Sequence, residues 1–354
     1  MRILILNRRD VANPDGGGAE IYTHEIACGL EGKYGCEVVV FSCLFQNSAT
    51  EEIIDRVTYM RKGNEATVHL WGLIHAVKNR RKFDYIIDEF NGIGFFTFFL
   101  PNSILLIHQL YKEFWFRDLG ALGALPYIIE SLLLKLYRRK LAITVSDSTK
   151  EDLRLLGFKD ISVIMNAIKY IPPDTPPQKS GAPVLVCLGR LKSTKRPEDA
   201  IIIFKEVKKN IPDVKLIVLG RGPEEEKLKK TANGLEGIIF AGWVKEEEKF
   251  SLLRQAHLLL VPSVREGFGI NVIEAAAAGT PAIGYDVPGL RDSIRNGETG
   301  YLVHSVEEGA SRIVELLNDH NLYERMTLAC VRYAKEFDWN KRVDEFWQII
   351  CAKK

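Results

Sequence analysis

Short apolar runs rich in Val, Ile and Leu alternate with helical patterns along almost the whole chain. Within each run the apolar residues are continuous, which is typical of parallel strands buried on both faces of a sheet. The pattern predicts an α/β protein built from doubly wound parallel sheets. The runs are Ile3–Leu6, Val38–Phe41, Tyr85–Asp88, Ile104–Ile107, Leu141–Val145, Ser162–Ile164, Val184–Leu188, Lys215–Leu219, Ile238–Phe240, Leu258–Val261 and Ala282–Ile283.

A proline-rich segment interrupts this alternation near the middle of the chain. Ile171–Pro183 carries five prolines and shows neither a helical nor a strand period. Such spacers are semi-rigid, and ligand sites are common in the clefts beside them. A chain of 354 residues accommodates two domains. We therefore predict a first domain over 1–171, a second over 172–335, and a docking helix over 336–354.

Composition excludes several classes of protein. Hydrophobic residues make up 46% and charged residues 27% of the chain, as in soluble globular proteins rather than disordered or fibrous ones. The net charge of +2 is far below that of a typical nucleic-acid-binding domain, so we expect no nucleic-acid partner. The six cysteines are too scattered for a disulfide scaffold and form no C-x-x-C pair. We expect a reducing, cytoplasmic location.

Two apolar segments resemble targeting or membrane sequences only superficially. The first residues, MRILILNRRD, lack the longer apolar core of a signal peptide and are typical of a first strand. Phe90–Tyr111 contains no charged residue and has the length of a membrane span. Because Asn, Gly and Pro interrupt it, we predict a short helix over Phe95–Leu100, a turn, and a buried strand over Ile104–Ile107.

Gly16, Gly17 and Gly18 form a glycine run between the first predicted strand and a helix. Glycines at this place let backbone N–H groups approach an anion at a helix N-terminus. The run is not the dinucleotide fingerprint G-x-G-x-x-G, because Ile21 stands where the third glycine belongs, and the chain has no P-loop sequence. A plain flexible loop is the alternative interpretation.

Arg190 and Lys195 lie in a basic segment after the first strand of the predicted second domain. Open α/β sheets bind ligands at the carboxyl ends of their strands. Two fixed cations at this place suit a diphosphate. A solvated basic loop is the alternative.

Glu266 and Glu274 are separated by seven residues and follow the buried strand Leu258–Val261. A helix begins between them, and its free N–H groups can meet an anion. Glu274 lies about one turn inside that helix, where it can accept hydrogen bonds from vicinal hydroxyls. Since a buried glutamate must be paired, the pattern favours a polyol ligand over two solvated glutamates.

In this order, the glycine-rich loop, the G-R-x-x-x-x-K motif and the E-x7-E motif resemble the retaining glycosyltransferases of GT-B fold, and glycosyltransferase family four in particular. The resemblance covers nearly the whole chain. Further matching segments are GGGAEIYTHEIACGL, ITVSDSTKEDL, VIMNAI, AGWV and EAAAAGTPAI.

This resemblance implies two facing Rossmann-like domains with an interdomain cleft. The second domain would bind a nucleotide-diphosphate sugar, a UDP- or GDP-sugar, and the first domain an acceptor, which is a glycan or a lipid-linked glycan. The helix over 336–354 would pack back on the first domain. The implied reaction transfers a hexose to an acceptor hydroxyl with retention of the anomeric configuration.

The resemblance also assigns the donor site by position. Arg190 and Lys195 would hold the diphosphate, Glu274 the ribose, and Glu266 the hydroxyls of the transferred sugar. The remaining donor-binding positions are glycines or backbone groups near the phosphates, the sugar or the base: Gly16, Gly17, Gly18, Gly242, Val244, Phe268, Gly269, Ile270 and Asn271.

The catalytic set implied by the resemblance comprises Glu266, Arg190, Lys195 and His108. His108 ends the strand Ile104–Ile107 and would lie near the donor sugar. Many relatives have His-Asp where this chain has His108-Gln109, so the acidic partner of His108 stays open. The chain has no two aspartates two positions apart, the pattern of metal-dependent GT-A enzymes. We expect no metal or cofactor, and electrostatic stabilisation of the leaving diphosphate.

The acceptor side is expected in the first domain. Tyr111, Phe114, Trp115 and Phe116 cluster where a loop is predicted, which favours an acceptor or membrane contact. The apolar helix over residues 125–136, with the basic cluster Arg138–Lys140 after it, is interpreted as a core helix with a solvated end. The alternative is a peripheral seat on an anionic membrane surface.

Two other functions remain open. A nucleotide-sugar epimerase on the same scaffold would turn over the donor without an acceptor. A non-catalytic nucleotide-sugar-binding protein is the third class, although the presence of Lys195, Glu266 and Glu274 argues against it.

Overall fold

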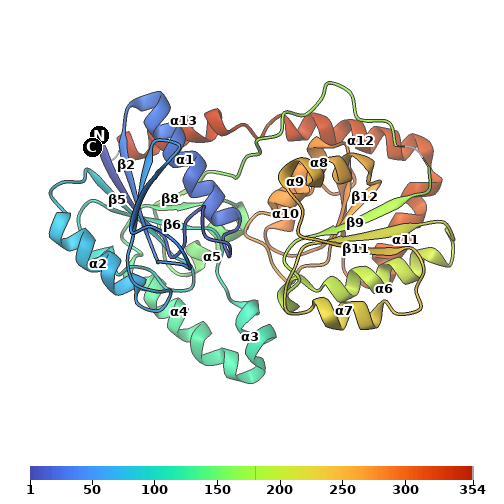
Figure 1. Ribbon diagram of the computed structural model, residues 1–354, viewed down its shortest axis with the longest axis horizontal. Helices are drawn as coiled ribbons and strands as arrows, with labels where there is room; N and C mark the ends of the chain where they lie inside the picture. Colours follow the sequence, from blue (N-terminus) through green and yellow to red (C-terminus); the bar gives the residue numbers. More distant parts are fainter. Residues whose placement is uncertain (180, 353–354) are drawn as a thin grey trace. The chain divides into compact units, whose positions relative to one another are not determined.

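The computed structural model describes residues 1–179 and 181–352, and the chain divides into two compact units (Figure 1). Unit 1 comprises Met1–Lys112, Ala124–Ala167 and Asp338–Lys354. Unit 2 comprises Glu113–Gly123 and Ile168–Phe337. Each unit contains one sheet, and the predicted doubly wound α/β architecture is confirmed. The sequence-based limits differ from these units mainly at Glu113–Gly123, which lies within unit 2.

Unit 1 is built on an eight-stranded sheet. Its elements are β1 (Arg2–Leu6), α1 (Gly18–Tyr34), β2 (Glu37–Ser42), β3 (Glu51–Ile54), β4 (Val57–Arg61), α2 (Val68–Asn79), β5 (Tyr85–Glu89), the 3-10 helix η1 (Thr97–Phe99), β6 (Ser103–Ile107), α4 (Ala124–Leu136), β7 (Ala142–Thr144), α5 (Asp147–Leu155), β8 (Ile161–Val163) and α13 (Trp339–Cys351). The strand order is β3-β4-β2-β1-β5-β6-β7-β8. In Figure 1, α1 and α13 cover one face of this sheet, and α2 and α4 lie at the other. The central strands are the continuous apolar runs, and they form the core.

A hairpin at one edge of this sheet escaped the sequence analysis. β3 pairs antiparallel with β4, whereas all other neighbours in the sheet are parallel. Asp55 and Arg56 join the two strands with φ angles of 47° and 70°, as a two-residue hairpin turn requires. The sequence EEII of β3 is mostly exposed and lacks the apolar run that marks a buried strand. The helix predicted over Phe95–Leu100 is also shorter than expected, because only Thr97–Phe99 forms a 3-10 turn.

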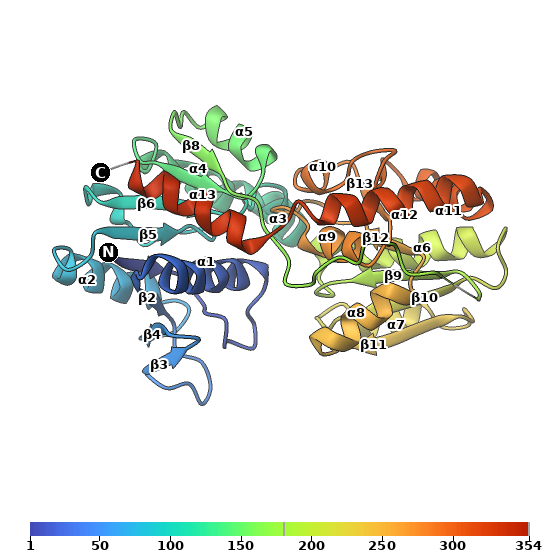
Figure 2. The ribbon, with the colours of Figure 1, turned by 90° about the horizontal axis from the view of Figure 1, so that it is seen from above.

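Unit 2 is built on a six-stranded parallel sheet. Its elements are α3 (Glu113–Leu119), η2 (Gly120–Gly123), β9 (Val184–Leu188), η3 (Ser193–Lys195), α6 (Pro197–Lys208), β10 (Lys215–Leu219), α7 (Glu225–Thr231), β11 (Ile238–Gly242), α8 (Glu246–Gln255), β12 (Leu258–Val261), α9 (Ile270–Ala277), β13 (Ala282–Tyr285), α10 (Leu290–Ser293), β14 (Gly300–Val303), α11 (Val306–Asn318) and α12 (His320–Ala334). The strand order is β11-β10-β9-β12-β13-β14. Helices α6 and α11 pack on one face, and α8 and α9 on the other (Figure 2).

The segment with the predicted aromatic loop is a helix of unit 2. Phe114 is buried in α3, and Phe116 is exposed, so the expectation of a loop over Phe114–Phe116 is wrong. Arg117 forms an ion pair with Glu198 at 3.1 Å. The hydroxyl of Ser193 donates a hydrogen bond of 2.7 Å to Asp118. These contacts hold α3 against the loop that follows β9.

The C-terminal helix α13 packs on α1 within unit 1. The rings of Tyr34 and Trp347 stack with their centroids 4.4 Å apart, and Tyr34 donates a hydrogen bond to Asp344. Gly29 provides the space for this packing, because a Cβ atom there would lie 2.3 Å from Val343 Cγ2.

Candidate active site

Apart from the glycine run Gly16–Gly18, which belongs to unit 1, the donor-site residues predicted from the sequence lie in unit 2, beyond the carboxyl ends of its strands. The strand order reverses between β9 and β12, and such a switch point is where open α/β sheets bind ligands. A small hollow at this place is lined by Arg190, Lys195 and Ser263, among others. Arg190 is exposed at the end of β9, while Lys195 lies one turn further in η3.

Lys195 and Glu266 form a direct ion pair. The Lys195 Nζ atom lies 2.6 and 2.5 Å from the two carboxylate oxygens of Glu266. The hydroxyl of Ser263 donates a further hydrogen bond of 2.6 Å to Glu266. Because the Glu266 side chain is only 11% exposed, this pairing compensates the burial of its charge. The sequence analysis singled out both charged residues but missed Ser263. Nothing in the sequence marks this serine except its position after β12.

Glu274 has a lysine partner that the sequence analysis missed. Lys249 of α8 lies 2.7 Å from Glu274 of α9 and 2.6 Å from Glu246. Burial raises the pKa of Glu274, and the Lys249 ammonium opposes this shift. Burial alone would lower the pKa of Lys249, but its carboxylate neighbours raise it above the usual value. No spacing in the sequence connects the two residues, because they come from different helices.

The start of α9 depends on Gly269, which has a φ angle of 86°. A Cβ atom at Gly269 would lie 2.9 Å from Ser293 Oγ, so only glycine fits this N-cap without strain. The Asn271 side chain donates a hydrogen bond of 3.1 Å to the Leu188 carbonyl and ties α9 to the end of β9. Phe268 is buried beside Phe337. The side chains of Phe268 and Asn271 are thus structural, and the backbone N–H groups at the start of α9 are the ones a ligand can use.

The loop after β11 contains an exposed tryptophan between two predicted residues. Gly242 ends β11 with a φ of 68°, and its carbonyl accepts a hydrogen bond of 2.7 Å from Gly220. Val244 is partly buried against the core. Trp243 is 67% exposed at this carboxyl edge. An exposed indole face can stack on a nucleobase, and the sequence analysis names this residue only within the AGWV segment.

In unit 1, the glycine run has two structural roles. A Cβ atom at Gly16 would lie 2.9 Å from the Asn13 carbonyl oxygen, so this turn needs glycine. The N–H of Gly17 donates a hydrogen bond of 2.7 Å to the Glu20 carboxylate. One of the amides expected to meet an anion is therefore already capped by the chain's own carboxylate.

His108 faces an acidic residue that the sequence analysis did not name. Glu89, at the end of the neighbouring strand β5, places Oε2 3.8 Å from His108 Nε2. Burial raises the pKa of Glu89, while His108 opposes the shift. The other carboxylate oxygen of Glu89 accepts a hydrogen bond from Thr23. The sequence signal that could have identified Glu89 is its position at the end of an apolar run.

Several buried polar atoms gather at this edge of unit 1. Asn7 follows β1, and Gln109 follows His108 after β6, the strand beside β5. Within the described residues, no hydrogen-bond partner is found for Asn7 Nδ2, Glu89 Oε2, His108 Nε2 or Gln109 Oε1. Buried polar groups are normally paired, so this edge of the unit 1 sheet is suited to a polar ligand.

Comparison with known proteins decides the family. The family described as Glycosyl transferases group 1 matches residues 173–330, and Glycosyltransferase Family 4 matches residues 16–169. The chain belongs to the family 4 type of glycosyltransferases. A phosphatidyl-myo-inositol mannosyltransferase from Mycobacterium leprae is 33% identical over 217 residues, 58% of this chain and 58% of that protein. The match thus spans little more than half of that relative's length.

Solved structures show that the chain has the GT-B fold. Sucrose-phosphate synthase from Thermosynechococcus elongatus superposes with a TM-score of 0.81 at 18% identity and covers 98% of both chains. Anabaena HepE, solved in complex with UDP and glucose, superposes with a TM-score of 0.76 at 17% identity, covering 99% of this chain and 100% of that chain.

Proposed function

We propose that this glycosyltransferase moves a hexose from a UDP- or GDP-sugar to an acceptor hydroxyl, with retention of the anomeric configuration. The observation that carries the donor assignment is the Lys195–Glu266–Ser263 cluster at the switch point of the unit 2 sheet. A cation and a buried carboxylate held side by side suit the two halves of such a donor, the diphosphate and the sugar hydroxyls. The HepE structure, described with UDP and glucose bound, supports this reading.

Each group has a part in the proposed step. The bond between the anomeric carbon and the diphosphate oxygen breaks, the acceptor oxygen forms the new bond to that carbon, and the acceptor's hydroxyl proton passes to the departing diphosphate. Arg190, Lys195 and the N-terminus of α9 stabilise the charge on the departing diphosphate. Glu266 orients the sugar, and Glu274 holds the ribose. His108 acts near the donor sugar, and Glu89 positions its imidazole ring. The proposed step uses no metal or cofactor.

We also propose that the acceptor is lipid-linked and that unit 1 docks on the cytoplasmic face of a membrane through α4. Large aliphatic side chains on the outer side of this helix are 46–66% exposed: Leu125, Ile128, Ile129 and Leu132, followed by Leu136 at 48%. Its buried side holds Leu134, which packs in the core of unit 1, and Glu130, which accepts hydrogen bonds from the backbone N–H groups of Tyr111 and Lys112. Most of the aliphatic side chains of α4 therefore face outward, and the interpretation as a core helix is wrong.

Charge complements this apolar face. Lys135, Arg138 and Arg139 are exposed at the end of α4, where they match an anionic lipid surface. Lys140 does not contribute to this basic surface in the same way, because its ammonium donates a hydrogen bond to the Leu100 carbonyl and burial lowers its pKa. By length and composition, residues Glu113–Leu136 pass as a membrane span, with 17% of the apolar window buried. Since α4 itself is about 20 Å long, it fits an interfacial position rather than a crossing.

A donor panel tests the proposed reaction. The purified protein is incubated with UDP-, GDP- and ADP-sugars, and the products are followed over time. A glycosyltransferase hydrolyses its own donor slowly and releases the nucleotide diphosphate. Epimerised donor without released nucleotide would indicate the epimerase. Binding without any turnover would indicate the non-catalytic nucleotide-sugar-binding protein. Retention is read from the anomeric configuration of the product once an acceptor is found.

A further inference from the structure

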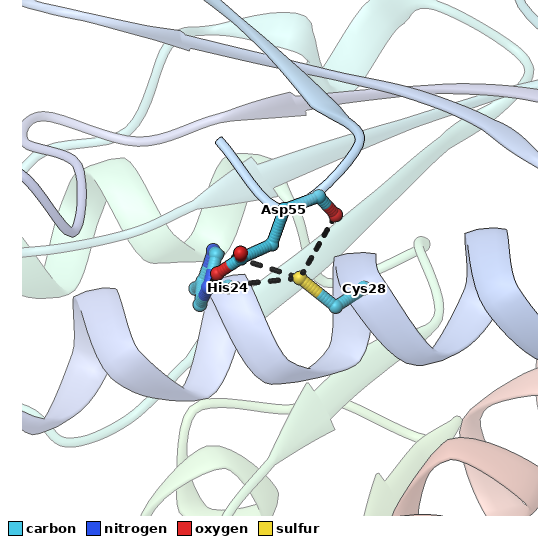
Figure 3. Close-up of side chains that lie close together, drawn as sticks. All are labelled: His24, Cys28 and Asp55. Atoms are coloured by element: carbon cyan, nitrogen blue, oxygen red, sulfur yellow. Dashed lines mark hydrogen bonds and ion pairs between the residues drawn. The ribbon is translucent and has the colours of Figure 1, made fainter. Parts of the chain in front are cut away.

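We propose that His24, Cys28 and Asp55 form a zinc-binding site in unit 1, separate from the groups used for sugar transfer. Figure 3 shows His24 and Cys28 on successive turns of α1, with Asp55 facing them from the turn between β3 and β4. One potential ligand atom from each residue lies within 4.8 Å of the others. Imidazole nitrogen, thiolate sulfur and carboxylate oxygen together form a ligand set typical of zinc.

The distances from His24 Nε2 to the other two ligand atoms are close to those around a tetrahedral ion. With zinc–nitrogen and zinc–oxygen bonds of about 2.0–2.1 Å and a zinc–sulfur bond of about 2.3 Å, tetrahedral angles place nitrogen about 3.6 Å from sulfur and about 3.3 Å from oxygen. In the structure, His24 Nε2 lies 3.6 Å from Cys28 Sγ and 3.1 Å from Asp55 Oδ2. Cys28 Sγ is nearly as close to Nδ1, at 3.7 Å, as to Nε2, so zinc binding also requires the Cys28 side chain to rotate towards the Nε2 side of the ring.

A second shell already orients the histidine. The other ring nitrogen, Nδ1, lies 2.8 Å from the hydroxyl oxygen of Tyr59 on β4. Without an ion, the Asp55 carboxylate can only accept a hydrogen bond, so Nε2 carries the ring proton and the Tyr59 hydroxyl donates to Nδ1. On zinc binding the ring proton moves to Nδ1, where the Tyr59 hydroxyl accepts it, and Nε2 is left to bind the ion. Metal-binding histidines typically have their second nitrogen fixed in this way.

The chain also presents the ligands at positions of fixed geometry. His24 and Cys28 are four residues apart on α1, which places them on one face of the helix. Asp55 lies in the two-residue turn with a φ of 47°, and its side chain is 72% exposed, whereas that of His24 is 6% exposed. The ion can therefore enter from solvent, and water completes the coordination. On binding, the Cys28 thiol loses its proton to solvent and the sulfur forms the metal bond.

Zinc at this site would tie the edge hairpin to α1. β3 is the outermost strand of the sheet and is held there by β4 alone. A metal bond between the β3–β4 turn and α1 would add a cross-link between segments about 30 residues apart. We therefore expect bound zinc to raise the thermal unfolding temperature of the protein.

The full-length protein, freed of metal with a chelator and kept reduced, provides the test. Titration with Co²⁺ should give one equivalent of binding and a sulfur-to-cobalt charge-transfer band. Competition with a chromophoric chelator then measures the zinc affinity. Cys28→Ser should abolish the band, and Asp55→Asn should weaken zinc binding while keeping the turn, since Asn tolerates a positive φ. Tyr59→Phe should weaken zinc binding about 10- to 100-fold.

The matched control is Cys351→Ser, because Cys351 is the other cysteine that is not fully buried. It should keep the cobalt band, the zinc affinity and the zinc-dependent rise in unfolding temperature. The proposal is overturned if the wild-type protein shows no charge-transfer band, or if Cys28→Ser and Cys351→Ser reduce the band equally. A zinc affinity that is unchanged in Asp55→Asn would also overturn the three-ligand site.

Discussion

At the scale of single residues, the proposed donor site contains two carboxylates with little exposure, and each has a lysine partner. Lys195 neutralises Glu266, and Lys249 neutralises Glu274. An unpaired charge in such places would be costly to bury. The pairs therefore hold two hydrogen-bond acceptors in place, and the proposed roles of the two glutamates can be tested separately.

Glu274→Ala and Glu266→Ala should have different effects on nucleotide binding. If Glu274 holds the ribose, its loss removes a charged hydrogen bond and weakens nucleotide diphosphate binding about 10- to 100-fold. Glu266→Ala should leave that affinity equal or higher, because Lys195 is released from its ion pair, while sugar transfer collapses. Calorimetry and a donor-consumption assay measure both effects. Glu246→Ala, which removes only the exposed partner of Lys249, is the control; equal losses of nucleotide affinity in Glu266→Ala and Glu274→Ala contradict the assignment.

Glu89→Gln should stabilise the protein at neutral pH and impair transfer. Burial raises the pKa of Glu89 above its usual value of 4.5, so the folded state binds this proton more tightly than the unfolded state. The corresponding stability is present below pH 4.5 and is lost as pH rises through the folded pKa. The loss is about 1.4 kcal/mol for each pH unit that separates the folded from the unfolded pKa. Glutamine avoids that loss.

Thermal unfolding between pH 4 and 8 checks the Glu89 prediction. The unfolding temperature of Glu89→Gln should exceed that of the wild type at pH 7–8, and the difference should vanish near pH 4. Glu37→Gln, at an exposed carboxylate of the same unit, should show no such trend. Unimpaired transfer by Glu89→Gln would remove Glu89 from its proposed role beside His108.

At the scale of elements, the packing of α13 on α1 depends on one missing side chain. Gly29→Ala would place a Cβ atom 2.3 Å from Val343, and we expect this overpacking to lower the free energy of unfolding by about 1–3 kcal/mol. Gly32→Ala, on the same helix, has no heavy atom within 4 Å of the new Cβ and should raise it by about 0.5–1 kcal/mol. Denaturant unfolding measures both changes. Adding Val343→Ala should rescue Gly29→Ala; if it does not, the contact is not the cause.

At the scale of the whole molecule, the net charge of +2 is too small to attract a membrane by itself. The attraction must come from the local combination of the apolar face of α4 and the cations beside it. Surface potentials decay within about 8 Å at physiological ionic strength. A patch can therefore act independently of the overall charge.

We accordingly expect the protein to bind anionic vesicles and to bind neutral ones much more weakly. Replacing Arg138 and Arg139 by Gln should weaken binding about 30-fold, since each cation contributes about 1 kcal/mol. Leu132→Asn should weaken binding at low and high salt alike, because its contribution is apolar. Vesicle sedimentation measures both. Leu155→Asn, at an exposed leucine of α5, is the control. A dimer that forms through α4 in solution, with no vesicle binding, would contradict the membrane assignment.

The sequence alone determined the architecture and the placement of the proposed donor-site charges at one edge of the unit 2 sheet. Continuous apolar runs mark strands buried on both faces, because such runs are stable only between two layers of helices. Motifs at the ends of those runs must reach the same sheet edge, because parallel strands share one carboxyl edge. For this reason the positions of Arg190, Lys195 and Glu266 along the chain are enough to place them together.

Only the tertiary structure decided which groups pair and which faces are left exposed. Lys249 meets Glu274, and Glu89 meets His108, through contacts between separate elements that no local spacing encodes. The exposed β3–β4 hairpin carries no apolar run, so it escaped the sequence analysis and with it the approach of Asp55 to His24 and Cys28. The sequence places the leucines of α4 in a core, because an apolar helix face indicates burial without identifying what covers it. Burial and pairing are properties of the packed chain, and they depend on residues far apart in the sequence.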